Sequence, residues 1–282
     1  MSGFSPTWLA LREPADFSAR NIALRAAVAH WLEPFERPVI VDIGCGTGSN
    51  LRALAPYLGA RQRWRLIDHD ANLLQAAREN LLQWGAAAEP ASSARIVIAR
   101  DGKIIDVSFE QADLGCGVEA LLQEGCDLIT AAAFFDLAGE GWIEKFCAAI
   151  VAHKTAFYTA LTYDGQEDWS PGHLADAAVL AAFHAHQRRD KGLGPAAGPG
   201  ATQCLAAGLE RAGWRVKTAP SPWRLGASDG ALIAALADGS AQAASQTGLV
   251  SPEDVEHWRI ARRKAQNVTI GHMDLFAQPT RG

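Results

Sequence analysis

The sequence predicts an α/β fold in which helices cover both faces of a mostly parallel sheet. Strand-like apolar runs alternate with helix-like stretches along most of the chain, and this alternation is typical of parallel sheets. The first strand, at residues 38–43, is a continuous apolar run, as expected for a strand buried on both faces, and it leads into a glycine-rich loop. With 282 residues, 49% hydrophobic and 20% charged, the chain is long enough for one such domain.

The first half of the chain follows this alternation closely. The apolar stripe of Leu74, Ala77 and Leu81 predicts an amphipathic helix. Asp101-Gly102 between two apolar runs predicts a β-hairpin. The expected elements are a helical segment at 16–33, the strand at 38–43, a helix at 51–58, a strand at 64–67, a helix at 71–84, hairpin strands at 95–100 and 104–109, and a strand at 126–133.

The second half continues the pattern after one interruption. Residues 164–200 are rich in glycine and proline around a single helical piece at 174–187, which predicts loops with hinges rather than strands. The other expected elements are helices at 142–151, 202–212, 230–246 and 252–265, and strands at 156–163, 214–218 and 267–276.

Composition and charge narrow the range of partners. The formal net charge is −5, and no long basic run is present, whereas nucleic-acid-binding proteins usually carry a basic face. No apolar run reaches the roughly 18 residues of a membrane span, and the N-terminus lacks the pattern of a secretory signal. The five cysteines show no CxxC spacing, which fits reduced thiols. We therefore expect a cytoplasmic protein that binds neither nucleic acid nor membrane, and no metal site.

The segment VIVDIGCGTGS at residues 39–49 points to a bound ligand. A strand brings Asp42 to the start of a loop in which Gly44, Gly46 and Gly48 alternate, and a helix follows. Glycines let the backbone approach a ligand closely, and a helix N-terminus offers free N–H groups. Asp68 ends the next strand, where nucleotide folds place a ribose-binding carboxylate. A tight turn without a ligand is the alternative interpretation.

The spacing of these glycines argues against a dinucleotide. The dinucleotide fingerprint is GxGxxG, whereas this loop has GxGxG, with Ser49 where the last glycine would stand. The carboxylate of Asp42 would repel a pyrophosphate but suits an ammonium or sulfonium group. An NAD-dependent oxidoreductase is therefore the less favoured alternative.

These segments resemble the class I S-adenosylmethionine-dependent methyltransferases. VDIGCGTGSN is similar to the first motif of that family, and RLIDHDANLLQAAREN is similar to its second. Residues 111–114 resemble the adenine-contacting segment, and residues 126–131 resemble the fourth strand, at whose end methyl transfer occurs. More loosely, HAHQRRDKGLGP resembles a segment of bacterial members that act on small molecules. The resemblance spans residues 36–163 and returns at 214–276.

The resemblance implies a three-layer Rossmann-like sheet of seven strands with an antiparallel last strand. It implies one domain over residues 1–282, made of an N-terminal helical cap (1–35), a cofactor-binding half (36–163), a helical lid insertion (164–204) and the C-terminal part of the sheet (205–282). It implies S-adenosyl-L-methionine as cofactor. The implied contacts are the loop residues Gly44, Cys45, Gly46 and Gly48 for the methionine part, Asp42 for its amino group, Asp68 for the ribose hydroxyls, His69 beside the adenine or ribose, Asp113 and Leu114 for the adenine, and Ala131 at the end of the fourth strand.

The lid contains candidates for the chemistry. His184 and His186 are two residues apart and share no helix face, which argues against a zinc site, but either is a candidate general base. Arg188, Arg189 and Lys191 favour an anionic acceptor. The alternative is a solvated helix end with cations at its C-terminus.

Other residues are candidates for lining the acceptor site. Phe134 follows the fourth strand and is expected to line the pocket, and Tyr163 and Trp223 are candidates for stacking on a flat acceptor, with ordinary packing as the alternative. Arg12 and Arg20 lie either over the cofactor cleft or on the surface.

Methyl transfer requires alignment of the reacting atoms, exclusion of water and, for a neutral acceptor, removal of a proton. No Asn/Asp-Pro-Pro-Tyr/Phe tetrapeptide follows the fourth strand, which argues against amide or exocyclic base-amine methylation of that type. No Pro-Cys is present, which argues against cytosine-C5 methylation. We predict methyl transfer to an O, N or C atom of a small molecule, with an acidic one favoured by the lid cations. The alternatives are a non-methylating enzyme or a cofactor-binding regulatory protein on the same fold. The sequence makes no prediction of the oligomeric state.

Overall fold

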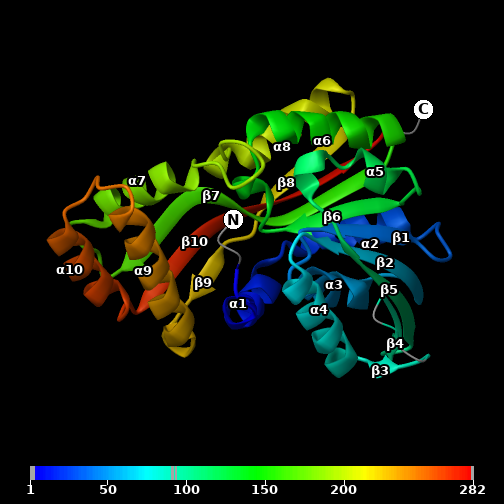
Figure 1. Ribbon diagram of the computed structural model, residues 1–282, viewed down its shortest axis with the longest axis horizontal. Helices are drawn as coiled ribbons and strands as arrows, with labels where there is room; N and C mark the ends of the chain where they lie inside the picture. Colours follow the sequence, from blue (N-terminus) through cyan, green and yellow to red (C-terminus); the bar gives the residue numbers. More distant parts are fainter. Residues whose placement is uncertain (1–3, 90–91, 93, 281–282) are drawn as a thin grey trace.

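The computed structural model describes residues 4–89, 92 and 94–280 and centres on one twisted sheet (Figure 1). Within the described residues, ten strands form this sheet in the order β3-β4-β5-β2-β1-β6-β7-β10-β8, with β9 paired to β10 beside that path. The strands are β1 (Val39–Ile43), β2 (Arg61–Asp68), β3 (Ala86–Ala87), β4 (Arg95–Arg100), β5 (Lys103–Gln111), β6 (Leu128–Ala132), β7 (Ala156–Ser170), β8 (Arg215–Pro220), β9 (Trp223–Leu225) and β10 (Asn267–Gln278).

The predicted fold class is confirmed. The strands β5, β2, β1, β6 and β7 are parallel to their neighbours in that series, and β10 runs antiparallel to both β7 and β8. The seven-stranded arrangement with one antiparallel strand is therefore present. Three short strands add to it: β4 forms the predicted hairpin with β5 around Asp101-Gly102, β3 extends that hairpin, and β9 pairs with β10.

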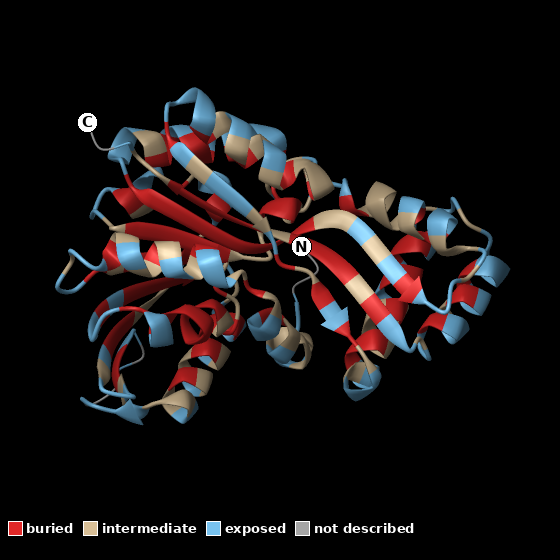
Figure 2. Cartoon of the chain, turned by 180° about the vertical axis from the view of Figure 1, so that it is seen from behind, coloured by how far each residue is buried: buried red, intermediate tan, exposed pale blue. Residues whose placement is uncertain are grey.

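Helices cover both faces of the sheet and create a core on each side (Figure 2). Successive residues of β1 point to opposite faces, so Ile40 joins one buried cluster and Val41 joins the other. The described helices are α1 (Pro6–Ala19), α2 (Ile22–Leu32), α3 (Ser49–Leu54), α4 (Ala71–Trp84), α5 (Glu119–Leu122), α6 (Glu140–His153), α7 (Asp176–Gln187), α8 (Ala201–Arg211), α9 (Gly230–Ser245) and α10 (Pro252–Arg262). None of them is long and apolar enough to cross a membrane.

The N-terminal segment differs from the expected single helix. Two helices form, because the chain breaks at Arg20, and Asn21 caps the second helix by accepting a hydrogen bond from the N–H of Leu24 at 3.1 Å. The break matters for the site, since it turns the side chain of Arg20 into the interior.

The prediction of loops after residue 163 is wrong for residues 164–170, which continue β7. Tyr163 pairs with His272 and Ser170 pairs with Asn267, and the register shifts near Gly165, whose φ is +88°. Asp164-Gly165 therefore marks an irregularity inside a strand rather than a turn. The outer parts of β7 and β10, together with β9, α7, α9 and α10, form what we call the helical lobe (Figure 1).

Residues 193–197 of the predicted lid are hydrogen-bonded to the loop after β6. The N–H of Ala197 donates to the carbonyl of Ala138 at 2.8 Å, and the N–H of Gly139 donates to the carbonyl of Leu193 at 3.1 Å. A Cβ on Gly139 would lie 2.7 Å from that carbonyl oxygen, so only glycine allows this approach. The division of the chain into parts of a single domain stays a prediction, and its outermost residues, 1–3 and 281–282, lie outside the described residues.

Candidate cofactor and acceptor site

The glycine loop between β1 and α3 has a left-handed backbone at each of its three glycines. The φ angles of Gly44, Gly46 and Gly48 are 61°, 54° and 77°. A Cβ on Gly44 would lie 2.6 Å from the ring of Phe134, and a Cβ on Gly46 would lie 3.1 Å from the side chain of Leu9. Phe134 and Leu9 therefore border the loop at Gly44 and Gly46, where a side chain would meet them.

Asp68 fixes the end of β2 to this loop. One carboxylate oxygen accepts a hydrogen bond from the N–H of Gly46 at 2.9 Å, and the other accepts from the N–H of Asp70 at 3.0 Å. The side chain of His69 lies beside the same carboxylate, with its Nδ1 3.2 Å away. Asp68 is 4% exposed. The structure thus brings together Asp68, His69 and the glycines, as the sequence predicts.

Asp42 lies beneath the loop, fully buried at the end of β1. Its Oδ1 accepts a hydrogen bond from the Asn50 amide at 2.7 Å, while its Oδ2 has no partner among the described residues. Burial raises the pKa of Asp42 to about 7, against the lowering effects of Asn50 and of the Arg20 charge.

Arg20 reaches the same place from the break between α1 and α2. It is 4% exposed and donates through Nη1 to the Asn50 carbonyl at 2.8 Å, but its Nε and Nη2 have no partner among the described residues. Buried guanidinium N–H groups and a buried carboxylate oxygen without partners raise the free energy of the folded state unless a ligand or water binds them. Two unpaired groups of opposite charge are therefore available beneath the glycine loop.

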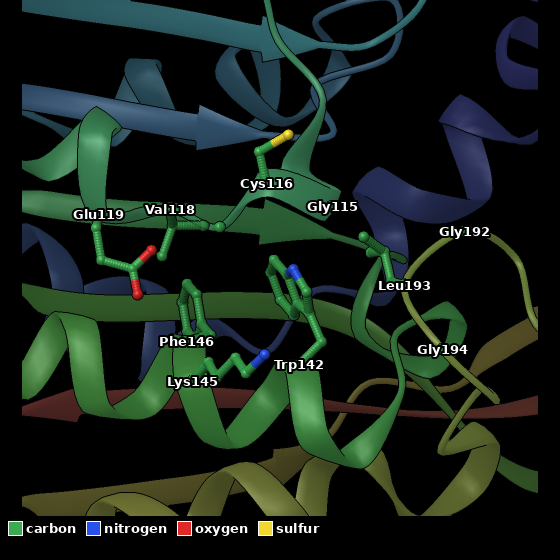
Figure 3. A pocket seen from close by; sticks show the side chains of 11 residues that line it. Gly115, Cys116, Val118, Glu119, Trp142, Lys145, Phe146, Gly192, Leu193 and Gly194 are labelled. Atoms are coloured by element: carbon green, nitrogen blue, oxygen red, sulfur yellow. The ribbon is translucent and has the colours of Figure 1, made fainter.

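The segment after β5 is held against α6. The Asp113 side chain accepts the N–H of Gly115 at 2.8 Å, and the Leu114 carbonyl accepts the indole N–H of Trp142 at 2.7 Å. A cavity of about 500 Å³ begins at Gly115, with Glu119 and Lys145 along its sides and the chain at residues 192–194 across it (Figure 3). Open space therefore borders the segment that the sequence assigns to adenine.

Two of the predicted cofactor residues are core residues in the structure. Ala131 is fully buried within β6 and packs in the cluster beneath α6. Cys45 is buried in the loop, and burial raises the pKa of its thiol. Cys45 therefore stays protonated and acts as a small packed side chain. The cofactor roles predicted for both residues stay predictions.

Asp136 lies in the 3-10 turn that follows β6 (Phe135–Leu137), close to Phe134. It is 8% exposed, and its Oδ2 accepts a hydrogen bond from the Gln187 amide at 3.0 Å. Its Oδ1 and the Gln187 carbonyl oxygen have no partner among the described residues. Burial raises the pKa of Asp136 to about 6, and the charge of Arg12 acts in the opposite direction. The structure thus places a carboxylate that titrates near neutrality at the end of the fourth parallel strand.

His184 and Tyr163 are neighbours across α7 and β7. The Tyr163 hydroxyl donates to Oε1 of Glu167 at 3.0 Å and lies 3.0 Å from Nε2 of His184. Because the hydroxyl donates to the carboxylate, it accepts the Nε2–H of His184. Burial and the nearby Arg188 lower the pKa of His184.

Apart from Arg188, which lies near His184, the other lid candidates lie elsewhere. His186 lies 2.8 Å from the Gln246 side chain, and Arg189 donates to the Gln246 carbonyl at 2.8 Å, so both contact the end of α9. Arg188 is exposed. Lys191 is half-buried and directly precedes the chain segment across the 500 Å³ cavity. The roles of these residues toward an acceptor stay predictions.

Trp223 and His272 pack against one another beside Arg12. The Trp223 indole donates to Asp16 at 3.1 Å, the Arg12 guanidinium lies 5.0 Å from the centroid of the Trp223 ring, and the centroid of the His272 ring lies 5.0 Å from it. Burial lowers the pKa of His272 to about 3, so its ring is neutral, and the Arg12 charge acts in the same direction. The roles predicted for Arg12 and Trp223 stay predictions.

Several of these residues were not predicted as site residues from the sequence. Asp136 comes just after the fourth strand, and Asn50 comes directly after the glycine motif at residues 39–49. These two positions in the sequence are the signals by which both residues could be found. Gln187 had no such signal, because it meets Asp136 only through the packing of α7.

Comparisons with known proteins agree with this architecture. The sequence matches no protein-family model and no curated protein sequence at a significant level. Among solved structures, the chain is similar to YcgJ of Bacillus subtilis, with 13% identity, a TM-score of 0.50, and coverage of 92% of this chain and 98% of that one. It is similar to a protein of Bacillus halodurans named as a methyltransferase, with 13% identity, a TM-score of 0.50 and coverage of 92% and 99%.

A third likeness is to a cyclopropane-fatty-acyl-phospholipid synthase-like protein of Lactobacillus casei, with 16% identity, a TM-score of 0.51, and coverage of 97% of this chain and 94% of that one. At such low identity these likenesses establish the fold alone. The chain has the same Rossmann-like fold as these proteins, one of which is named as a methyltransferase.

Proposed function

We propose that this protein is an S-adenosylmethionine-dependent methyltransferase that acts on a small molecule. The observation that carries the proposal is the contact between Asp68 and the glycine loop, which fixes a carboxylate beside the main chain of Gly46. The unpartnered polar atoms of Arg20 and Asp42 support it further, because a ligand with both an ammonium and a carboxylate group would satisfy both.

The residues present fit this cofactor. The main chain at Gly44 and Gly46 would hold the methionine part, Asp68 the ribose hydroxyls, and Asp113 and Leu114 the adenine, whose segment borders the 500 Å³ cavity. A pyrophosphate is disfavoured, because Asp42 and Asp68 both place negative charge at the loop. When bound, the cofactor supplies a methyl group activated by its sulfonium.

We assign the removal of the acceptor proton to Asp136. Its carboxylate has a free buried oxygen, it lies at the end of β6, and its pKa is raised toward neutrality. A general base works best when its pKa lies near the working pH. Gln187 holds the other oxygen, so the free oxygen keeps a fixed direction. His186 contacts α9 and is less suited to this role.

Tyr163 and Trp223 are buried, and each ring packs against the ring of His272, with centroids 6.2 Å and 5.0 Å apart, which fits ordinary packing. The predicted preference for an acidic acceptor gains no support from Arg188, which is exposed, or from Arg189, which contacts α9. The proposed acceptor is therefore a small molecule with an ionisable O–H or N–H, whose proton Asp136 would accept.

A ligand panel tests the proposal. In thermal-shift titrations, S-adenosylmethionine and S-adenosylhomocysteine should raise the melting temperature, and NAD should leave it unchanged. The release of S-adenosylhomocysteine is then measured in the presence of a library of small-molecule acceptors. Turnover would identify an enzyme, and cofactor binding without turnover would indicate a cofactor-binding regulatory protein. Stabilisation by NAD alone would refute the proposal.

A further inference from the structure

A second cavity, of about 250 Å³, lies within the helical lobe. Its walls come from β7, α7, α9 and α10, and its rim includes the exposed residue Ala177. Pockets for drug-sized ligands usually measure about 300–1,000 Å³. This cavity is therefore suited to a ligand of few atoms.

Aromatic rings form much of the cavity wall. Trp169 from β7 and Trp258 from α10 are both buried, and their ring centroids lie 5.6 Å apart with the planes inclined at 69°. Phe183 of α7 adds a third ring. The face of an aromatic ring attracts a cation, and cages of such rings are known to bind quaternary ammonium groups.

Two carboxylates lie among these rings, and the indole N–H groups hold them in place. Trp169 donates to Oε2 of Glu167 at 2.9 Å, and Trp258 donates to Oδ1 of Asp176 at 2.8 Å. Each ring and its carboxylate therefore fix one another in position.

The two carboxylates differ in charge compensation. Asp176 lies 3.2 Å from the guanidinium of Arg262. Glu167 makes no ion pair with any residue the structure describes, and its partners are the neutral groups of Tyr163 and Trp169. Burial raises the pKa of Glu167, and the nearby charge of Asp176 acts in the same direction. A cationic ligand would supply the missing charge.

We propose that this cavity binds a small organic cation, such as an alkylammonium or quaternary ammonium ion, against the rings of Trp169, Trp258 and Phe183, with Glu167 as its counter-ion. An anion would be repelled by Glu167 and Asp176, and a neutral ligand would leave Glu167 uncompensated. The site goes beyond the proposed function, because it requires neither the methyl donor nor a methyl acceptor.

Calorimetric titration with choline and with its uncharged isostere 3,3-dimethylbutan-1-ol tests the site. We expect choline to bind at least about tenfold more tightly than the isostere, because desolvated cation–π contacts form only with the charged ligand. Glu167→Gln should weaken choline binding at least about tenfold. Asp168→Asn is the matched control, because Asp168 is exposed and is the neighbouring residue on the same strand, and it should leave binding unchanged.

Three results would overturn the proposal: no binding of choline, equal binding of choline and the isostere, or unchanged binding in Glu167→Gln. If near-UV circular dichroism shows that Glu167→Gln does not fold, Ala177→Trp replaces it. That substitution at the exposed rim should block choline binding without altering any charge, and unchanged choline binding in this variant would also refute the site.

Discussion

The amide of Gln187 donates a 3.0 Å hydrogen bond to the carboxylate of Asp136, joining the end of α7 to the turn after β6. This bond leaves one carboxylate oxygen free and buried at the expected point of methyl transfer. It also links the helical lobe to the cofactor-binding part of the sheet. The proton-transfer predictions depend on this pair.

Asp136→Asn should lower turnover strongly while leaving cofactor binding intact. The loss expected for a missing general base is about 10²–10⁴-fold in rate. The measurement is the rate of S-adenosylhomocysteine release, together with the affinity for S-adenosylhomocysteine. Glu140→Gln, an exposed carboxylate in the first turn of α6, is the control. A turnover within about threefold of wild type would remove Asp136 from the mechanism.

Gln187→Leu should move the acidic limb of the pH–rate profile to higher pH. The hydrogen bond from Gln187 stabilises the ionised carboxylate and lowers the pKa of Asp136, which burial alone raises. Its loss raises the pKa above its value of about 6, so a higher pH is needed to ionise the base. Turnover in the wild type should therefore rise through about pH 6, and the profile of the variant should be displaced upward. An unshifted limb would mean that another group titrates.

Asp42 should make the folded protein less stable as the pH rises from 5 to 7. Its pKa is about 7 in the folded state against an ordinary value of 3.8, so between these values the folded state binds a proton that the unfolded state has lost. Stability from this group is therefore lost with rising pH, by about 2 kcal/mol over this range. Urea unfolding at pH 5 and pH 7 gives the free energy of unfolding of wild type and of Asp42→Asn. The difference between the two proteins at each pH isolates the contribution of Asp42, because the other titrating groups are common to both. If the free energy of unfolding of wild type increases relative to that of Asp42→Asn between pH 5 and pH 7, the assignment is contradicted.

Gly44→Ala should damage both folding and cofactor binding. The φ of +61° disfavours a side chain by about 1 kcal/mol, and the new Cβ would lie 2.6 Å from the Phe134 ring. We expect the free energy of unfolding to fall by about 2 kcal/mol or more. Gly59→Ala is the control, because a Cβ there meets nothing within 4 Å. Equal effects of the two substitutions on stability would refute the argument from Phe134.

The sequence predicts the glycine loop and its surroundings well because their signals are local. The bounds of α4 match the prediction, and Asp68 lies against Gly46 as the motif implies. These features depend on short-range periodicity and on a glycine spacing that few other structures require.

The helical lobe was not predictable in the same way. Residues 164–170 are mostly polar and include Asp164-Gly165, which favours a turn when considered alone. They form a strand because β10, about a hundred residues later, pairs with them. The contact of Gln187 with Asp136 likewise depends on tertiary packing, and no local pattern indicates it.

The most direct test of the central claim is calorimetric titration of S-adenosylhomocysteine into wild type and Asp68→Ala, with Glu253→Ala, an exposed residue of α10, as control. A charge-assisted hydrogen bond contributes about 1.5–3 kcal/mol, so Asp68→Ala should weaken binding by about 10–100-fold or more, and Glu253→Ala should bind as wild type. If wild type does not bind S-adenosylhomocysteine, or if Asp68→Ala binds it equally well, the glycine loop and Asp68 are not the cofactor site.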